Sequence, residues 1–338
     1  MTFRVRAARG DDVDAIYQMA ELTGGGFTNL PADRDTLSQK LERSDNSFAR
    51  EGDEQAADLY VFVLEDPKTK AIRGTCQVFG QVGVVQPFYS YQLSTLTQTS
   101  PELGKTFRNQ LLSLTTDLEG SSEVGGLFLH PDARSGGWGA LLARSRYLFI
   151  RRNRPRFGEQ VLAELRGVID EGGNSPFWDA ICGRFFDMTF PEADKFNAIH
   201  GTRFIADLMP RTPIYVSLLD ESARAVMGQP HPSGRGALKM LEAEGFYFDR
   251  YLDIFDGGPT VVSDTDDIKT VCDATEDVIA EIGDGGTSDV LLSTGGLKDF
   301  VSCFGRVKKI ARKGLLVDAE AADLLGVQVG DTVLSVAR

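Results

Sequence analysis

A glycine-rich turn in the middle of the sequence carries residue types that can bind phosphate. The stretch from Leu127 to Pro131 is typical of a short strand stopped by proline, and the apolar spacing of 139–151 predicts a helix. Between them, Arg134 begins the pattern Arg-x-x-Gly-x-Gly, whose glycines are Gly137 and Gly139. Glycine leaves backbone N–H groups uncovered, and the start of a helix attracts anions, so this turn is a candidate pyrophosphate site.

A tight turn without a ligand is the plain alternative, because short glycine patterns are common. The segment is not a Walker loop, since no Gly-Lys-Ser/Thr follows it, and its spacing differs from that of a Rossmann turn. The strand before the turn and the amphipathic helix after it favour the ligand-binding interpretation.

His231 is a candidate for proton transfer, because imidazole exchanges protons near neutral pH. It stands between Pro230 and Pro232, ahead of a helix predicted from Ala237, so we expect a rigid loop. On the residues alone, a lone surface histidine is more often without function. Both interpretations of His231 therefore stay open at this point.

The overall composition excludes several classes of function. The 338 residues carry a formal net charge of −13, which disfavours nucleic acid as a partner because phosphate binding needs a basic surface. The sequence lacks the run of about 18 apolar residues that a membrane span needs. Its first residues alternate between apolar and basic types, unlike a signal peptide. The four cysteines and three histidines are scattered, so we expect no metal site, no disulfide scaffold and a cytoplasmic location.

The order of predicted elements indicates a mixed α/β (α+β) sheet with helices on both faces. Alternating or continuous apolar runs predict the strands, the second and third of which form a hairpin, and amphipathic spacing predicts the helices. The predicted strands are 3–8, 60–65, 74–82, 126–130 and 161–165, and the predicted helices are 13–20, 37–43 and 139–151, with a further helix opening at Ser175.

Two domains are expected, a core over 1–258 and a small, mostly β C-terminal subdomain over 259–338, where short β-rich pieces alternate with Gly and Asp. Within the subdomain, Val327 to Val333 predicts a hairpin. Residues 237–255 predict a helix and then a strand, and 177–190 has a similar plan. Two explanations fit this similarity equally well. One is a degenerate second copy of the core fold, beginning at about 185, and the other is a pair of ordinary helix–strand units.

The glycine turn resembles the acyl-CoA pyrophosphate loop of the GNAT superfamily, whose pattern is Gln/Arg-x-x-Gly-x-Gly/Ala. The start of the sequence, Arg4-x-Arg6 with Asp11-Asp12 before a helix, also resembles that superfamily. The resemblance is not confined to the turn: over roughly residues 3 to 262, the sequence is similar to the arginine N-succinyltransferase family. The motifs that carry this similarity are Pro87–Tyr91, Arg166–Glu171, Ser175–Trp178, Leu208–Tyr215, Gly228–Pro232, Leu241–Phe246 and Tyr251–Thr260.

The resemblance implies a GNAT α/β core with an extra C-terminal β subdomain. It implies transfer of a succinyl group from succinyl-CoA, a co-substrate rather than a bound cofactor, to the α-amine of L-arginine in arginine catabolism. Leu127 falls at the family's succinyl-CoA contact, and His231 falls at its catalytic histidine, a proton donor. The backbone N–H of Leu127 or Phe128 can polarise the thioester carbonyl if the strand splays there.

The sequence departs from the family at the strand before the turn. Gly125 and Gly126 stand where Cys-Thr is usual, His130 replaces Asp, and Pro230 replaces a small aliphatic residue. Because these changes touch the acyl-CoA strand, the acyl-chain preference stays open.

Recognition of arginine needs carboxylates for its guanidinium and a cation for its carboxylate. The strand end with Glu164 and Arg166, and the pair Asp170-Glu171, can contribute, although each can equally be an ordinary solvated charge. The cation for the succinyl carboxylate is not identified. Ornithine or another amine as acceptor, and a non-catalytic acyl-CoA-binding subunit, remain as alternatives, as do a homo-oligomer and a hetero-oligomer with a paralogous subunit.

Overall fold

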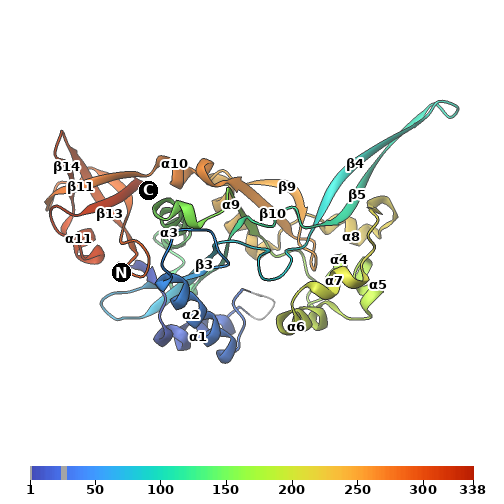
Figure 1. Ribbon diagram of the computed structural model, residues 1–338, viewed down its shortest axis with the longest axis horizontal. Coiled ribbons are helices and arrows are strands. Elements are labelled where there is room, and N and C mark those ends of the chain that lie inside the picture. The colour runs from blue at the N-terminus through green and yellow to red at the C-terminus, as the bar shows by residue number, and fades with distance from the viewer. Residues whose placement is uncertain (1, 24–28) are drawn as a thin grey trace. The chain divides into compact units, whose positions relative to one another are not determined.

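The computed structural model describes residues 2–23 and 29–338 of a mixed α/β chain, which divides into two compact units (Figure 1). Each unit is assembled from separate stretches of the sequence. Unit 1 comprises Met1–Gly80, Ser122–Glu159 and Asp264–Arg338, and unit 2 comprises Gln81–Ser121 and Gln160–Ser263.

Four antiparallel strands form the centre of unit 1. The predicted hairpin is confirmed as β2 (Leu59–Glu65) and β3 (Ile72–Phe79), with β1 (Arg4–Ala7) on one side and β6 (Ser122–Leu129) on the other. Every residue of β2 is buried, which explains its unbroken apolar run, since both of its faces are covered.

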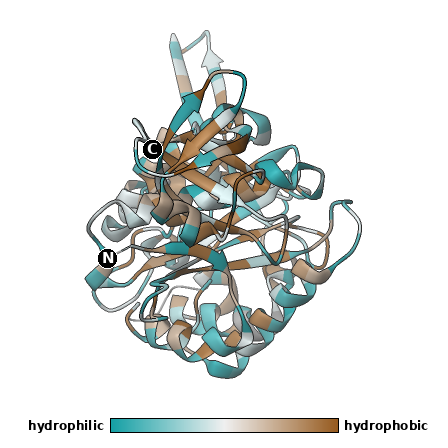
Figure 2. Cartoon of the chain, turned by 90° about the vertical axis from the view of Figure 1, so that its left-hand side faces the viewer, coloured by the Kyte–Doolittle hydropathy of each residue, from teal (hydrophilic) through white to brown (hydrophobic). Residues whose placement is uncertain are grey.

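Helices cover both faces of this part of the sheet, as the sequence predicts. The helices α1 (Val13–Glu21) and α2 (Arg34–Ala49) lie side by side on one face, where Leu37 and Leu41 pack against Val61 (Figure 1). The helix α3 (Trp138–Arg152) lies on the other face, where the Cys76 thiol donates to the Leu142 carbonyl. Figure 2 shows hydrophobic residues concentrated along the strands, whereas the helices alternate in character.

The opening charges of the sequence are structural. The Arg6 guanidinium is buried and pairs with Asp12 at 2.8 Å and with Glu65 at 3.1 Å. Burial alone would raise the pKa of Glu65, but its ion pairs with Arg4 and Arg6 lower that pKa below its ordinary value. The motif at the start of the chain therefore ties β1 to β2 and to the turn before α1.

The C-terminal part of unit 1 is a closed five-stranded barrel. Its strands pair in the ring β12–β15–β11–β14–β13, and β13 returns to pair with β12. The helix α11 packs against it, with Leu324 and Leu325 in the same apolar cluster as Ile279, Leu292 and Val333. The elements are α10 (Lys269–Asp273), β11 (Thr275–Ile282), β12 (Ser288–Thr294), β13 (Val301–Ile310), β14 (Gly314–Val317), α11 (Ala319–Leu325) and β15 (Thr332–Ala337).

Unit 2 has a six-stranded sheet in the order β7–β10–β9–β4–β5–β8. Its core contains Phe177 and Trp178, both fully buried, with Tyr91 and Leu252. The strands are β4 (Ser90–Ser100), β5 (Lys105–Thr115), β7 (Gln160–Glu164), β8 (Ile214–Tyr215), β9 (Tyr247–Leu252) and β10 (Pro259–Asp264). The helices are α4 (Pro176–Ala180), α5 (Gly183–Phe186), α6 (Phe190–His200), α7 (Arg203–Leu208), α8 (Glu221–Val226) and α9 (Arg235–Ala243).

Three parts of the structure differ from the sequence-based expectation. Residues 90–115 form a long two-stranded ribbon that was not predicted, because their sequence is mostly polar (Figure 1). Residues 185–190 contain the end of α5, an irregular segment and the first residue of α6 rather than a strand, so they lack the helix-then-strand plan of α9 and β9. Val327 to Val333 is the turn after α11 and the start of β15, because Gly326, with φ 71°, ends that helix and no partner strand precedes β15 there.

Across residues 2–23 and 29–338, none of the helices is both long enough and apolar enough to span a membrane.

Candidate active site

The predicted phosphate-binding turn has the strand–turn–helix geometry expected of it. β6 ends at Leu129, the exposed residues Arg134 to Gly137 make the turn, and α3 begins at Trp138. Gly136 and Gly137 have φ of 74° and 82°, a left-handed conformation that glycine adopts without strain. Because the first N–H groups of a helix have no partner within it, the start of α3 presents donors at this turn.

The two glycines of the pattern differ in their surroundings. A Cβ added to Gly137 would meet Nη2 of Arg338 at 2.9 Å, in addition to the strain of its positive φ. A Cβ on Gly139, which lies inside α3 with no positive φ, would meet only Leu129 at 3.8 Å, an ordinary contact. Glycine is therefore required by the backbone at Gly137 and not at Gly139.

Arg338 adds a cation to this turn that the sequence does not reveal. Its Nη2 donates to the Gly136 carbonyl at 2.8 Å, and its guanidinium lies 4.0 Å from the centre of the Phe304 ring. Arg134, the arginine of the pattern, is exposed and donates from Nε to the Leu129 carbonyl at 3.3 Å. The two arginines come from positions about 200 residues apart, so no local pattern could have joined them.

A β-bulge interrupts β6 where the acyl group is expected. Thr75 of β3 pairs with Phe128. Gln77, two residues further along β3, pairs with Gly125. Two residues of β6, one of them Leu127, therefore oppose a single residue of β3. Because a bulge disrupts the regular ladder and redirects the backbone, the Leu127 N–H lies at a point where it can serve a ligand.

His231 lies in unit 2, at the start of a short turn before α9. Its Nδ1 is 2.7 Å from the Ser233 hydroxyl, which can accept a hydrogen bond from Nδ1–H or donate one to an unprotonated Nδ1. The Ser233 backbone N–H lies 3.3 Å from Nδ1 and can donate to it only in the tautomer whose Nδ1 is unprotonated. These contacts fix the ring through Nδ1 and leave Nε2 for other partners. Burial and then the charge of Arg166 lower the pKa of His231 below its ordinary value, so the ring is mainly neutral at pH 7.

Arg166 stands beside His231. The His231 backbone N–H donates to the Arg166 carbonyl at 2.7 Å, and Gly167 forms a β-bridge with Pro230. The Nε atom of Arg166 is buried and has no hydrogen-bond partner among the described residues. The charge of Arg166 also acts on Asp194, whose pKa is raised by burial and by Asp253. This corner of unit 2 thus brings together a histidine, a cation and a carboxylate.

The buried carboxylate of Asp256 holds this corner in place. Asp256 accepts from the N–H groups of Gly167 at 2.7 Å and Gly258 at 2.8 Å. Burial and the charge of Asp253 raise the pKa of Asp256 well above its ordinary value. A Cβ on Gly258 would meet the Leu165 carbonyl at 2.0 Å, so no other residue fits there. The motif from Tyr251 to Thr260 is therefore structural, and it fixes the backbone that carries Arg166.

Asp170, a further candidate from the sequence, is occupied by a turn. Its carboxylate accepts from the Asn174 backbone N–H at 2.8 Å, and this bond lowers the pKa of Asp170. The side chain therefore acts locally, and Arg166 is the stronger candidate for substrate recognition.

The predicted site residues thus fall into two groups. Leu127, Phe128, Arg134, Gly137 and Gly139 lie on one strand–turn–helix segment of unit 1. His231 lies in unit 2 with Arg166. Within residues 2–23 and 29–338, no group of three or more His, Cys, Asp and Glu side chains could hold a metal ion.

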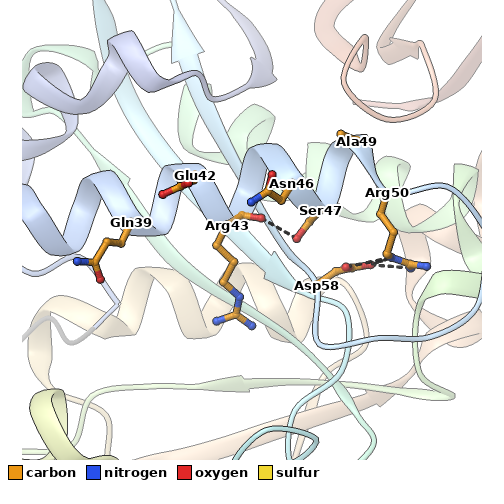
Figure 3. A pocket seen from close by; sticks show the side chains of 8 residues that line it. All are labelled: Gln39, Glu42, Arg43, Asn46, Ser47, Ala49, Arg50 and Asp58. Atoms are coloured by element: carbon orange, nitrogen blue, oxygen red, sulfur yellow. Dashed lines mark hydrogen bonds and ion pairs between the residues drawn. The ribbon is translucent and has the colours of Figure 1, made fainter.

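An open groove of about 550 Å³ along the outer face of α2 contains none of these residues (Figure 3). Its two arginines are already engaged. Arg50 pairs with Asp58 at 2.7 Å, and Arg43 donates to the Ala57 carbonyl at 2.7 Å. The groove therefore contains none of the predicted site residues, and both of its arginines already bond to groups of the chain.

Family models match nearly the whole chain. The model described as "Arginine N-succinyltransferase beta subunit" matches residues 3–270, and that of its C-terminal domain matches residues 274–337. The chain belongs to the arginine N-succinyltransferase family. It is 40% identical to the arginine N-succinyltransferase of Escherichia coli over 336 residues, covering 97% of this chain and 96% of that protein. The enzyme of this name from Citrobacter koseri is 45% identical over 269 residues, covering 79% of this chain and 77% of that protein.

A solved structure of the family has the same fold over its full length. It is arginine/ornithine succinyltransferase subunit AI from Pseudomonas aeruginosa, with a TM-score of 0.90 and 32% identity, covering 99% of this chain and 98% of that one. The family is one of acyltransferases, so the acyltransferase prediction is confirmed.

Proposed function

We propose that this chain transfers a succinyl group from succinyl-CoA to the α-amine of L-arginine. The observation that carries the proposal is the 40% identity to the E. coli arginine N-succinyltransferase across nearly all of both chains. The residues at the two candidate loops supply the chemistry that such a transfer needs.

The turn of unit 1 is proposed to hold the pyrophosphate of succinyl-CoA, in a GNAT-type arrangement. The N–H groups at the start of α3 and the exposed Arg134 are its proposed ligands, with Gly137 and Gly139 leaving the backbone open. Arg338 adds charge at the same turn. The Leu127 N–H at the bulge, with Phe128 beside it, is the proposed donor to the thioester carbonyl oxygen, where negative charge develops.

His231 is the proposed proton carrier. The mechanism uses the tautomer in which Nδ1–H donates to the Ser233 hydroxyl at 2.7 Å and the Ser233 backbone N–H makes no bond to the ring; Nε2 then has a free lone pair that accepts a proton from the attacking α-amine. The resulting imidazolium then gives this proton to the departing CoA sulfur as the C–S bond breaks. The lowered pKa of His231 supports this role, because a mainly neutral ring is ready to accept a proton at pH 7.

Arg166 is proposed to bind the α-carboxylate of the acceptor. The carboxylate and the α-amine of an amino acid share one carbon atom, so the cation that binds the first must lie beside the group that deprotonates the second. Arg166 adjoins His231 and has a buried Nε without a partner among the described residues. Asp194, on which the charge of Arg166 acts, is the candidate partner for the guanidinium.

Ornithine is a second candidate acceptor, favoured by the name of the P. aeruginosa structure, arginine/ornithine succinyltransferase subunit AI. It has the same α-amine and α-carboxylate but a shorter, ammonium-ended side chain. A carboxylate that pairs bidentately with a guanidinium discriminates between the two, so we expect ornithine to react more slowly.

The test is release of free CoA thiol from succinyl-CoA in the presence of each amine, with the product mass measured. Arginine is expected to yield a product succinylated at the α-nitrogen, and N-acetylarginine, whose α-nitrogen is an amide, is expected to yield none. A purified chain that succinylates no free amino acid, but still binds CoA, would support a non-catalytic subunit instead.

Assembly with a second subunit is also proposed. The matching family model and a P. aeruginosa relative, 37% identical over 332 residues, are named as β subunits. Light scattering of the purified chain, alone and with a co-expressed paralogous chain, distinguishes a monomer, a homo-oligomer and a hetero-oligomer. The domain boundary at 258/259, a second GNAT-like half and a cytoplasmic location stay predictions.

A further inference from the structure

Lys40 occupies an unusual position on α2. The buried stripe of this helix contains Leu37, Leu41, Ser44 and Phe48. Lys40 is three residues after the first of these and four before Ser44, so it lies on the same face, which packs against the sheet. A lysine in such a stripe needs a reason, because burial of an ammonium group is costly.

The half-buried side chain of Lys40 lines a small cavity of about 10 Å³ between α2 and the sheet. Its Nζ donates to the Asn29 carbonyl. The Asn29 side-chain oxygen in turn accepts from the Gln77 amide at 2.7 Å. Lys40 is the one cation among the described residues of the lining, which also includes Gly126. The cavity therefore has a cationic end and two amide groups beside it.

The cavity touches the strand expected to hold the thioester. Gly126, in its wall, precedes Leu127, and both belong to β6. A Cβ on Gly126 would meet the Gln77 side chain at 2.9 Å, and one on Gly125 would meet the Asn29 amide at 3.0 Å. The two glycines thus make room for polar side chains against the backbone next to the proposed carbonyl site.

The charge of Lys40 is only partly balanced in this cavity. Burial lowers the pKa of its ammonium to about 8, even though Glu123 acts to raise it, while Arg43 lowers it further. Glu123 therefore does not offset the cost of burying the ammonium, and a second carboxylate at the cavity would do so.

We propose that Lys40 binds the terminal carboxylate of the succinyl group, with the Gln77 amide as a second donor. This inference rests on the proposed function. A succinyl group carries its carboxylate two methylene groups beyond the thioester carbonyl, so the cation that reads it must lie within a few ångströms of the carbonyl site. The cavity as it stands has room for about one water molecule, so the long lysine stem must move when the carboxylate enters.

The test is the acyl-chain preference of Lys40→Met, measured as kcat/KM for succinyl-CoA and for butyryl-CoA with the same acceptor. Butyryl-CoA has a methyl group where succinyl-CoA has its carboxylate. We expect kcat/KM for succinyl-CoA to fall by about a hundredfold, and that for butyryl-CoA to stay within about threefold of the wild type. Lys40→Arg, which keeps a cation, should retain most of the preference.

Lys68→Met serves as a control, because Lys68 is exposed on the turn between β2 and β3 and its loss removes the same charge. If Lys40→Met does not fold, Lys40→Gln and Gln77→Leu give the same comparison. Equal losses with both acyl-CoAs, or an unchanged preference, would overturn the assignment of Lys40. A wild-type chain that does not prefer succinyl-CoA at all would instead contradict the proposed function itself.

Discussion

The turn of unit 1 that is proposed to bind phosphate is made almost entirely from one continuous stretch, Leu127 to Arg152, whereas the His231 corner of unit 2 is held by three stretches far apart in the sequence. At the turn, two glycines with positive φ and the start of a helix suffice. At the corner, His231 is bonded to Arg166, and Asp256 fixes Gly167. The first region is therefore built to expose backbone, and the second to orient side chains.

The comparison leads to different expectations for the two regions. Changes at the turn should weaken binding of succinyl-CoA and leave the chemical step intact. Changes at the corner should affect proton transfer and acceptor recognition and leave CoA binding intact.

The largest effect is expected from His231→Ala, which removes the proposed proton carrier and should lower kcat by about two to four orders of magnitude. His231→Asn is the matched control, because its side-chain amide can still hydrogen-bond the Ser233 hydroxyl but cannot carry the proton. Both variants should bind CoA like the wild type in calorimetry. Turnover that survives in both would remove His231 from the mechanism.

The next effect concerns the turn. Gly137→Val places a branched residue at a φ of 82° and against Arg338, so CoA affinity should fall by roughly ten- to a hundredfold. The sequence pattern alone gives Gly137 and Gly139 equal weight. The structure instead predicts that Gly139→Ala, in open helical geometry, stays close to the wild type in the same titration, and equal losses in the two variants would contradict this distinction.

Arg166→Gln tests recognition of the acceptor. We expect the wild type to prefer arginine to agmatine, which lacks the α-carboxylate. Loss of the cation should reduce this preference by at least about tenfold. The reaction with arginine should become slower, while the reaction with agmatine should change little. A preference that survives in Arg166→Gln would assign the carboxylate to another group.

The smallest effect is a shift in the pH profile. A proton acceptor must be unprotonated, so the acid limb of kcat/KM should follow the pKa of His231, which lies below its ordinary value. Burial is the first cause of that depression and the charge of Arg166 is the second. Arg166→Gln should therefore move the limb to higher pH by a fraction of a unit, and a limb that does not move would mean that the two groups do not interact.

Much of the fold could be predicted, because it follows from local patterns. The apolar run of β2 and the hairpin with β3 required no distant information, and the limits of α3 were found to within one residue. The ribbon of β4 and β5 was missed because its strands are rich in Thr, Ser and Gln, with no clear apolar alternation. The helix–strand plan read over 177–190 was not found there, because aromatic residues pack equally well on short helices.

In the candidate site too, the features made by local sequence were predictable and those made by distant residues were not. The turn with Gly137 was recognisable from its spacing, whereas Arg338 reaches it from the end of the sequence and leaves no local trace. Lys40 did leave a signal, since it interrupts the buried stripe of α2 at helical spacing. The structural role of Asp256 could not be foreseen, because its partners at Gly167 are 89 residues away.

The central claim is that binding of succinyl-CoA and proton transfer belong to different loops. It is tested most directly by the dependence of turnover on succinyl-CoA concentration in Gly137→Ala and His231→Asn, at saturating arginine. The account predicts that Gly137→Ala shows a raised KM but recovers a kcat within about threefold of the wild type, whereas His231→Asn stays slow at every concentration. Recovery of His231→Asn at high succinyl-CoA, or a kcat of Gly137→Ala that stays low at saturation, would contradict it.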